Sequence, residues 1–141
     1  MNRRAVLRVL DANTNRALEG VRVCEDIVRF SLQSPRRFAA LRRLRHAIAR
    51  AVRRLPLTPA TLLRVRESRR DIGRQARATR VRSLDQLLLI NFQRAKEALR
   101  VLEECTRMIA PRHTAVFQRL RFRIYQVERE TLLGLDPLRH R

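Results

Sequence analysis

Two Asn–Arg pairs recur at matching places in the chain, and their side chains are suited to holding an anion. Asn13 and Arg16 align with Asn91 and Arg94 when the sequence is shifted by 78 positions. A guanidinium can bind two phosphate oxygens at once, and an asparagine amide can both donate and accept hydrogen bonds. At about 100° per residue, all four positions fall within the apolar arc of a helix.

This placement predicts that both pairs point inward and line one shared pocket, because a buried polar group is costly unless it is hydrogen-bonded. A small neighbour one turn on, Gly20 in the first copy and Ala98 in the second, leaves space beside each guanidinium. The alternative is that each arginine reaches solvent or pairs with a glutamate. The sequence has no glycine-rich phosphate loop, so arginines and helix N-termini would have to hold any phosphate.

A second repeated line of polar residues follows the same two segments. It comprises Asn15, Glu19, Arg22, Asp26 and Arg29, matched by Gln93, Glu97, Arg100, Glu104 and Arg107. Spacings of three and four residues are typical of a solvated helix face with ion pairs. Glu19 and Glu97 border the apolar arc and are the better candidates for a site. Carboxylates of this line, such as Asp26 and Glu104, would suit Mg²⁺, although their spacing is not diagnostic.

Helices must position these residues, and the sequence marks where the first ones begin and end. Helical periodicity extends over about 2–32, and Ser34-Pro35 then opens a second helix that Leu55-Pro56 ends. Thr58-Pro59 starts a short helix. Residues 67–82 have little apolar periodicity, so we expect a loop there, and its length points to a function.

The second half repeats this order of elements. Residues 83–86 form a capping box before a long helix that we expect to reach about residue 110. Pro111 begins the last helix, and Gly134 and Pro137 close the fold. At a shift of 76 positions the second and fourth helices also match, through Arg43, Leu44, Arg45 and Ile48 against Arg119, Leu120, Arg121 and Ile124.

The expected fold is therefore all-α: an antiparallel helical bundle of two duplicated helical hairpins, with a short middle helix and a functional loop. We expect one domain over 1–141, with the first copy at about 2–54, the middle segment at 55–82 and the second copy at about 83–133. Two cysteines, Cys24 and Cys105, lie on the interior sides of their helices and have no metal-site spacing.

The formal net charge is +20, and Lys96 is the single lysine among 33 basic residues. Such a surplus attracts polyanions in general, although a bias in the coding DNA would also enrich arginine at ordinary surface positions. The sequence contains no stretch of about 18 apolar residues that would indicate a membrane span, and it shows no apolar core of a signal peptide. The expected location is the cytoplasm.

Several long segments resemble a small helical family of thiamine biosynthesis, the hydroxymethylpyrimidine-phosphate kinases. These proteins occur alone or as the N-terminal domain of thiamine-phosphate synthase. The similar segments are 11–26 (DANTNRALEGVRVCED) with Arg29-Phe30, 44–46 (LRH), 66–73 (RESRRDIG), 91–104 (NFQRAKEALRVLEE) and 120–125 (LRFRIY). Together they span nearly the whole chain.

The resemblance implies transfer of the γ-phosphoryl group of ATP to hydroxymethylpyrimidine phosphate with Mg²⁺, and arginines could neutralise the charge of that reaction. Arg16 and Arg94 would bind the phosphate oxygens. The metal could be held by one or more of the carboxylates Glu19, Asp26, Asp71 and Glu97. The loop at 71–73 could close over a ligand. The implied catalytic residues are Arg16, Arg94, Glu19 and Glu97. The implied binding residues are Asn13, Asn15, Arg22, His46, Arg66, Asp71, Gly73, Asn91 and Arg100, with Asp26 and Glu104 for metal.

The resemblance also implies which partners and activities to expect. The synthase barrel is absent from this sequence, so we expect no thiamine-phosphate synthase activity. The candidate partners are a phosphorylated pyrimidine, a nucleotide, a separate thiamine-phosphate synthase and a second copy of the chain in a homo-oligomer. Two alternatives stay open. One is a non-catalytic arginine-rich module that binds nucleic acid, which sparse aromatic residues argue against. The other is a bundle that binds a thiamine precursor without turnover.

Overall fold

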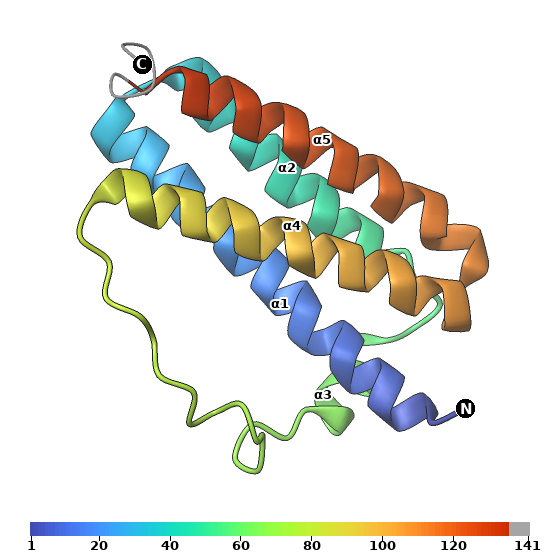
Figure 1. The fold of residues 1–141 in the computed structure, drawn as a ribbon. Helices are drawn as coiled ribbons and strands as arrows, with labels where there is room; N and C mark the ends of the chain where they lie inside the picture. The colour runs from blue at the N-terminus through green and yellow to red at the C-terminus, as the bar shows by residue number, and fades with distance from the viewer. Residues whose placement is uncertain (136–141) are drawn as a thin grey trace.

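Four long helices form an antiparallel bundle in the computed structural model, which describes residues 1–135 (Figure 1). They are α1 (Arg3–Ile27), α2 (Pro35–Arg53), α4 (Leu84–Ile109) and α5 (Thr114–Leu133). Each packs against two others: α1 against α2 and α4, and α5 against α2 and α4. Residues 1–135 contain no strand, so the expected all-α bundle is confirmed.

Local sequence signals explain the boundaries of the first hairpin. Asn2 caps α1 by accepting a hydrogen bond from the Ala5 backbone N at 3.0 Å. The helix does not run regularly to residue 32, because a π-helical segment, Val28–Leu32, follows it and Gln33 then turns the chain at a positive φ of 51°. Ser34 caps α2, accepting from the Arg37 backbone N at 3.3 Å.

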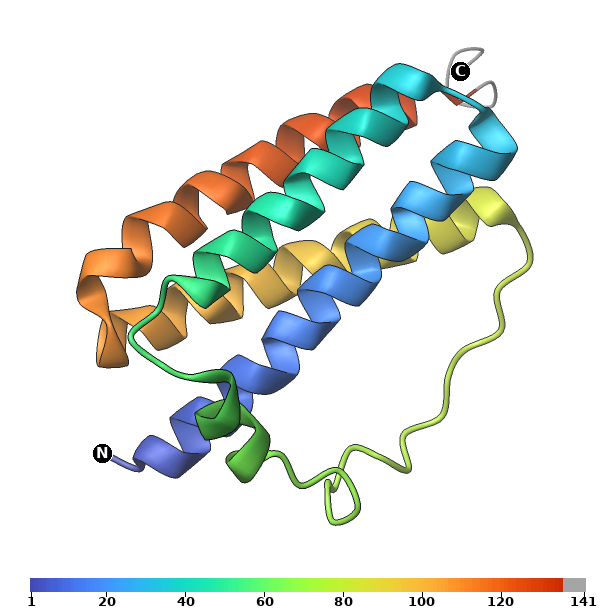
Figure 2. The ribbon, with the colours of Figure 1, turned by 180° about the vertical axis from the view of Figure 1, so that it is seen from behind.

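The middle segment contains one short helix, α3 (Pro59–Val65), and a long loop. Thr58 caps α3 through the Thr61 backbone N at 3.2 Å. Residues 66–83 form no helix, as expected of the loop, and in Figures 1 and 2 they arch away from the bundle before α4 begins. Among the described residues no helix has the length and apolar character needed to cross a membrane.

The second hairpin follows the same rules as the first. Ser83 caps α4 by accepting from the Gln86 backbone N at 3.0 Å, and Gln86 Oε1 accepts from the Arg82 backbone N at 2.9 Å. Pro111 opens a short 3₁₀ turn, Pro111–His113, and α5 then runs to Leu133 and Gly134. Pro137, expected to close the fold, lies outside the described residues.

Helices α1 and α4 cross closely, because small residues line their contact. A Cβ atom placed on Gly20 would lie 3.0 Å from the Asn91 carbonyl oxygen and 3.4 Å from the Ala95 Cβ. The Cys24 thiol donates a long hydrogen bond to the Leu88 carbonyl further along the same crossing, at 3.7 Å. The core beneath consists of fully buried aromatic and aliphatic side chains, among them Leu10, Val21, Leu41, Leu44, Ile48, Phe92, Leu99, Phe117 and Ile124.

Candidate binding cleft between α1 and the middle loop

An ion pair attaches the middle loop to the first half of α1. The Asp11 carboxylate is 5% exposed and accepts hydrogen bonds from Arg66 at 2.8 Å (Nε to Oδ2) and 2.7 Å (Nη2 to Oδ1). This hydrogen-bonded pair and the charge of Asp11 raise the pKa of Arg66. The Arg8 guanidinium also donates to the Glu67 carbonyl oxygen, at 3.4 Å. The start of the loop is therefore anchored along α1.

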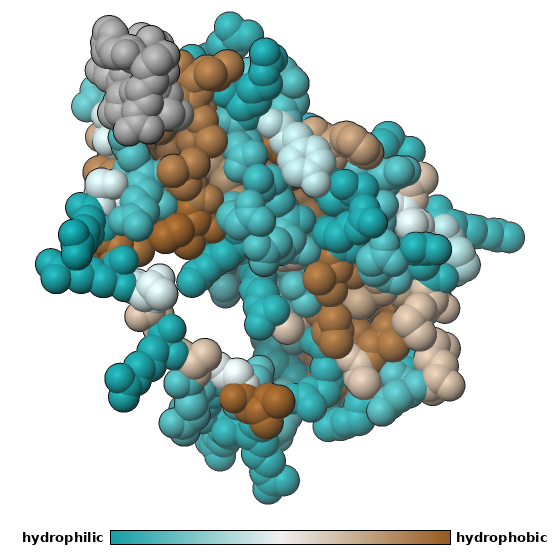
Figure 3. Space-filling model, in the orientation of Figure 1, coloured by the Kyte–Doolittle hydropathy of each residue, from teal (hydrophilic) through white to brown (hydrophobic). Residues whose placement is uncertain are grey.

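Two neighbouring cavities open between this anchored loop and α1. The smaller, about 190 Å³, and the larger, about 410 Å³, share Arg8, Ala12 and Asp71. The other lining residues are Asp11, Asn15, Val65, Arg66, Glu67 and Ser68 in the first, and Val9, Asn13, Arg16, Arg70 and Ile72 in the second. Figure 3 shows open space between the outer part of the loop and the bundle that side chains leave unfilled. We call the two cavities together the α1–loop cleft.

The larger cavity of the α1–loop cleft carries positive charge that ion pairs do not neutralise. Arg8, Arg16 and Arg70 line its larger cavity, and none of them forms an ion pair within residues 1–135. The Asp71 carboxylate faces them from the loop, where its Oδ1 also accepts from the Gly73 backbone N at 2.8 Å. Three guanidiniums against one carboxylate suit a phosphate-bearing ligand.

The repeated asparagines are buried, as their place in the apolar arc predicts. Asn13 is 6% and Asn91 5% exposed. Each uses its amide nitrogen within its own helix: Asn13 donates to the Val9 carbonyl at 2.8 Å and Asn91 to the Leu87 carbonyl at 2.9 Å. These matched bonds satisfy the buried amides without a ligand, although Asn13 still lines the α1–loop cleft.

The prediction that Arg16 and Arg94 point inward is wrong. Both side chains are exposed, and so are Glu19 and Glu97, which were expected to border the interior. The Glu97 carboxylate accepts from Gln93 Nε2 at 2.9 Å on the helix surface. The close approach of α1 and α4 at their small residues leaves no room for long side chains between them, so these four turn outward.

The two copies of the motif therefore do not form one shared pocket in the α1–loop cleft. Asn13, Asn15 and Arg16 line the cleft, whereas their counterparts Asn91 and Arg94 do not. The residue that corresponds to Asp11 in the second copy is Leu89, which cannot bind an arginine. The loop consequently anchors on one copy only.

The second polar line forms a surface network, as its spacing predicts. Arg22 pairs with Asp26 at 3.2 Å. In the second copy Glu104 pairs with Arg107 at 3.0 Å and with Arg100 at 3.5 Å. The expected metal ligands Asp26 and Glu104 are thus both engaged by arginines. Residues 1–135 contain no group of three or more His, Cys, Asp or Glu residues placed to hold a metal, and Mg²⁺ binding stays a prediction.

His46, expected to contribute to binding, lies exposed on α2 and does not line the α1–loop cleft. Gly73 lies in the exposed loop next to the cleft. The sequence reasoning missed Asp11, Arg8 and Arg70. The sequence could have indicated Asp11, because this carboxylate falls at helical spacing on the same face of α1 as the buried residues Leu7 and Leu10.

Comparisons with known proteins place the chain in thiamine biosynthesis. A thiamine-phosphate synthase of Synechocystis sp. is 38% identical over 136 residues, one of Gloeobacter violaceus 36% over 143, and one of Rhodopirellula baltica 33% over 141. The matches cover 92%, 93% and 98% of this chain and 37% of each relative. The chain thus spans little more than a third of the length of these relatives. No solved structure matches.

These names overturn the expected activity. The relatives are thiamine-phosphate synthases by name, an enzyme class different from the phosphomethylpyrimidine kinase that the resemblance implied. The kinase prediction is therefore wrong. The same names contradict the companion expectation of no thiamine-phosphate synthase activity, whereas a separate synthase as partner stays a prediction.

A family model matches most of the same segments that carry the resemblance. The match extends over residues 8–130, from the first half of α1, through the loop that Asp11 anchors, to near the end of α5. It includes both Asn–Arg pairs and the whole α1–loop cleft. By this match the chain belongs to the ThiD2 family.

Proposed function

We propose that this chain is the helical part of a thiamine-phosphate synthase and binds a phosphorylated precursor in the α1–loop cleft. The relatives' name supports the reaction, because each is called a thiamine-phosphate synthase. The observation that supports the site is the unneutralised arginine group beside the anchored loop, Arg8, Arg16 and Arg70.

The polar groups of the cleft suit a phosphate ester of a polar heterocycle. The guanidiniums of Arg16 and Arg70 can hold the phosphate oxygens. The Asn15 amide lines the smaller cavity, where it could donate and accept hydrogen bonds with ring nitrogens and an exocyclic amine. The apolar side chains of Val9 and Ile72 offer surface for the ring itself.

Binding of hydroxymethylpyrimidine phosphate to the purified chain tests the site. Titration calorimetry should show saturable binding that is at least about tenfold weaker in Arg16→Ala and Arg70→Ala, because each variant loses a charged hydrogen bond. Arg112→Ala removes an equal charge from an exposed turn away from the cleft and serves as the matched control. Equal weakening by the control variant would reject the cleft.

A chimera tests the reaction. In the Synechocystis sp. relative, the segment that matches this chain would be replaced by this chain. The formation of thiamine phosphate from the pyrimidine and thiazole precursors would then be measured. We expect the chimera to retain synthesis and to lose most of it with Arg66→Ala, which detaches the loop. Synthesis that is unaffected by Arg66→Ala would contradict a role for this chain in the reaction.

A further inference from the structure

An apolar groove lies between the end of α1, with the π-helical segment after it, and the start of α4. Its cavity of about 520 Å³ is lined by Val23, Asp26, Ile27, Phe30, Ser31, Leu84 and Leu87. Two of these apolar side chains remain largely exposed, Phe30 at 66% and Leu84 at 52%. Figure 3 shows hydrophobic atoms on the surface near the start of α4. Apolar surface that gathers in one place is typical of an interaction site, and we call this surface the Phe30 groove.

The duplication places an equivalent surface at the other end of the α1–α4 pair. At the shift of 78 positions Val9 matches Leu87 and Met108 matches Phe30. At that end the loop lies opposite the helix, because Val9 and Ile72 line the same cavity of the α1–loop cleft. No residue of the loop lines the Phe30 groove. One copy of the repeated surface therefore faces another segment, whereas the other copy faces none within residues 1–135.

Two residues of opposite charge lie beside the Phe30 groove, toward the middle of the helices. Glu19 on α1 and Arg94 on α4 are both exposed, and neither forms an ion pair within residues 1–135. Gly20 approaches both Asn91 and Ala95 on the antiparallel helix, which sets Glu19 level with Arg94. Their charges are thus at the same height along the helix pair, and both are available to a partner.

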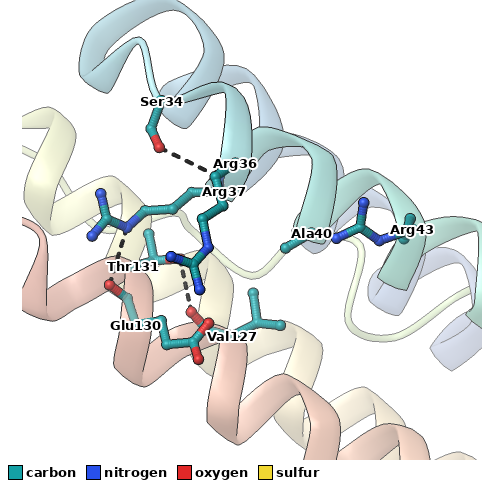
Figure 4. Close-up of a pocket in the computed structure, with 8 residues that line it drawn as sticks. All are labelled: Ser34, Arg36, Arg37, Ala40, Arg43, Val127, Glu130 and Thr131. Atoms are coloured by element: carbon teal, nitrogen blue, oxygen red, sulfur yellow. Dashed lines mark hydrogen bonds between the residues drawn. The ribbon is translucent and has the colours of Figure 1, made fainter.

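The opposite side of the bundle, between α2 and α5, has a different character. The lining of its cavity includes three arginines, Arg36, Arg37 and Arg43, and a single carboxylate, Glu130 (Figure 4). Two such surfaces from chains of net charge +20 would repel each other. The side formed by α1 and α4 is therefore the better place for a second copy of the chain.

The middle loop leaves open space on that same side. In Figures 1 and 2 it arches from α3 to the start of α4, on the side of α1 and α4 that faces away from α2 and α5. Residues 68–80 are all exposed, and their backbone hydrogen bonds, such as that from Ala76 N to the Gly73 carbonyl oxygen at 3.0 Å, join residues of the loop to one another. The loop thus leaves room for a second body against α1 and α4.

We propose that two copies of the chain associate through the Phe30 groove, in a symmetric dimer whose twofold axis runs parallel to α1 and α4. Such an axis keeps each residue at its height along the helices, so α1 of one copy packs antiparallel to α4 of the other. Phe30 then lies against Leu84 and Leu87 of the second copy, and Glu19 lies opposite Arg94 of the second copy. Each contact occurs twice. The first half of α1, which carries the α1–loop cleft, lies beyond this contact, so the dimer does not depend on the proposed function.

Sedimentation equilibrium of the full chain tests the dimer, in about 0.3 M sodium chloride to screen the net charge. We expect a mass that approaches twice that of one chain as the concentration rises to about 200 µM. Phe30→Glu and Leu84→Glu should each weaken association at least about tenfold, because each dimer would bury two added carboxylates. Leu84 is the first residue of α4, where an acidic side chain favours the helix, so this variant should keep its fold.

The matched control is Phe122→Glu, which makes the same change on α5. Phe122 is 57% exposed, comparable with Phe30, and its variant should associate within about twofold of the unmodified chain. Circular dichroism verifies equal helix content in all variants. An unmodified chain that stays monomeric would overturn the dimer, and a control that weakens association as much as Phe30→Glu would overturn the interface.

Charge reversal tests the twofold arrangement. Glu19→Arg alone and Arg94→Glu alone each place like charges in both symmetric contacts and should weaken association at least about tenfold. An equal mixture of these two variants should associate within about threefold of the unmodified chain, because both contacts of the mixed dimer again join opposite charges. A mixture that associates no more tightly than its components would overturn this arrangement.

Other occupants of the Phe30 groove would give different results. Association that requires a short oligothymidylate, and weakens as sodium chloride is raised, would assign the surface to nucleic acid and overturn the dimer. A monomeric chain that binds the part of the Synechocystis sp. relative outside the matched segment, and loses this binding with Phe30→Glu, would likewise overturn it. Arg70→Ala changes only the α1–loop cleft and should leave self-association within about twofold, so the dimer and the proposed function can fail separately.

Discussion

Two buried glutamates show how single residues hold the duplicated hairpins together. Glu25 is 2% exposed and receives two hydrogen bonds from Arg45, with the Nε contact at 2.5 Å. Its counterpart Glu103, 6% exposed, receives the same pair from Arg121, with the Nε contact at 2.6 Å. These bonds are the main reason that the pKa values of both arginines are raised. Each pair joins the two helices of one hairpin.

Removing either arginine should destabilise the bundle by a similar amount. Arg45→Ala and Arg121→Ala each leave a buried carboxylate without its hydrogen-bonded arginine, although Arg100 stays 3.8 Å from Glu103, and each costs about 3 kcal/mol in the free energy of unfolding. Arg107→Ala breaks only an exposed pair and should cost at most about 0.5 kcal/mol. Urea denaturation measures all three. A loss at Arg121 no larger than that at Arg107 would contradict the structural role of these pairs.

The buried thiol of Cys24 gives a dependence of stability on pH. Burial raises the pKa of Cys24 above its ordinary value, and the nearby charge of Glu128 adds to the effect. Above about pH 9 the unfolded chain releases a thiol proton that the folded chain keeps, so stability falls as the pH rises. Between pH 8 and pH 10 the unmodified chain should lose about 1.4 kcal/mol more than Cys24→Ala does. Equal losses in urea titrations of both would contradict this.

At the scale of elements, the crossing of α1 and α4 sets where functional side chains can lie. Gly20 brings the α1 backbone against Asn91 and Ala95 of α4, so long side chains near the crossing turn outward. The same closeness allows Asn13 and Asn91 to be buried with only their own helix as partner. The α1–loop cleft therefore forms at the side of α1 and not between the two helices.

A larger residue at the crossing should separate these helices. Gly20→Val places methyl groups against the α4 backbone and should lower the free energy of unfolding by about 1 to 3 kcal/mol. Glu19→Val, one residue earlier and exposed, introduces the same β-branched side chain into α1 without the clash and is the control. Thermal denaturation followed by circular dichroism would measure both. A stable Gly20→Val protein would show that the crossing is looser than described.

At the scale of the whole molecule, the charge is the dominant feature. A net charge of +20 on 141 residues makes the folded chain repel itself, and the ion pairs use only part of the arginines. The larger cavity of the α1–loop cleft is where arginines from α1 and the loop gather, and Arg8, Arg16 and Arg70 there form no ion pair within residues 1–135. Ligand binding in this cavity would use charge that otherwise destabilises the bundle.

Salt should therefore stabilise the protein. Raising sodium chloride from about 20 mM to about 300 mM shortens the Debye length severalfold and should raise Tm by about 3 °C or more. Hydroxymethylpyrimidine phosphate at the same ionic strength should raise Tm further, because the proposed ligand of the α1–loop cleft would bind the folded chain only. Scanning calorimetry distinguishes the two contributions. A Tm that falls with sodium chloride would contradict net self-repulsion.

The sequence by itself determined the helices and their duplication, because these depend on local rules. Caps at Ser34, Thr58 and Ser83 begin helices wherever a side-chain oxygen can accept from a free backbone N–H, with no need of tertiary contacts. The unstructured loop before α4 followed from the lack of apolar periodicity. A family resemblance located the relevant pathway, whereas the names of the relatives corrected the activity.

Only the tertiary structure decided which repeated polar residues are buried and where a ligand can bind. Periodicity places a residue on an arc around the axis of its own helix. Each long helix here has two neighbouring helices, and the way these neighbours cross it decides which part of the arc is buried. Arg16 and Glu25 belong to the same repeat, yet one is exposed and the other lies between α1 and α2. The pairing of Asp11 with Arg66 spans 55 residues, so no local rule could have located the cleft.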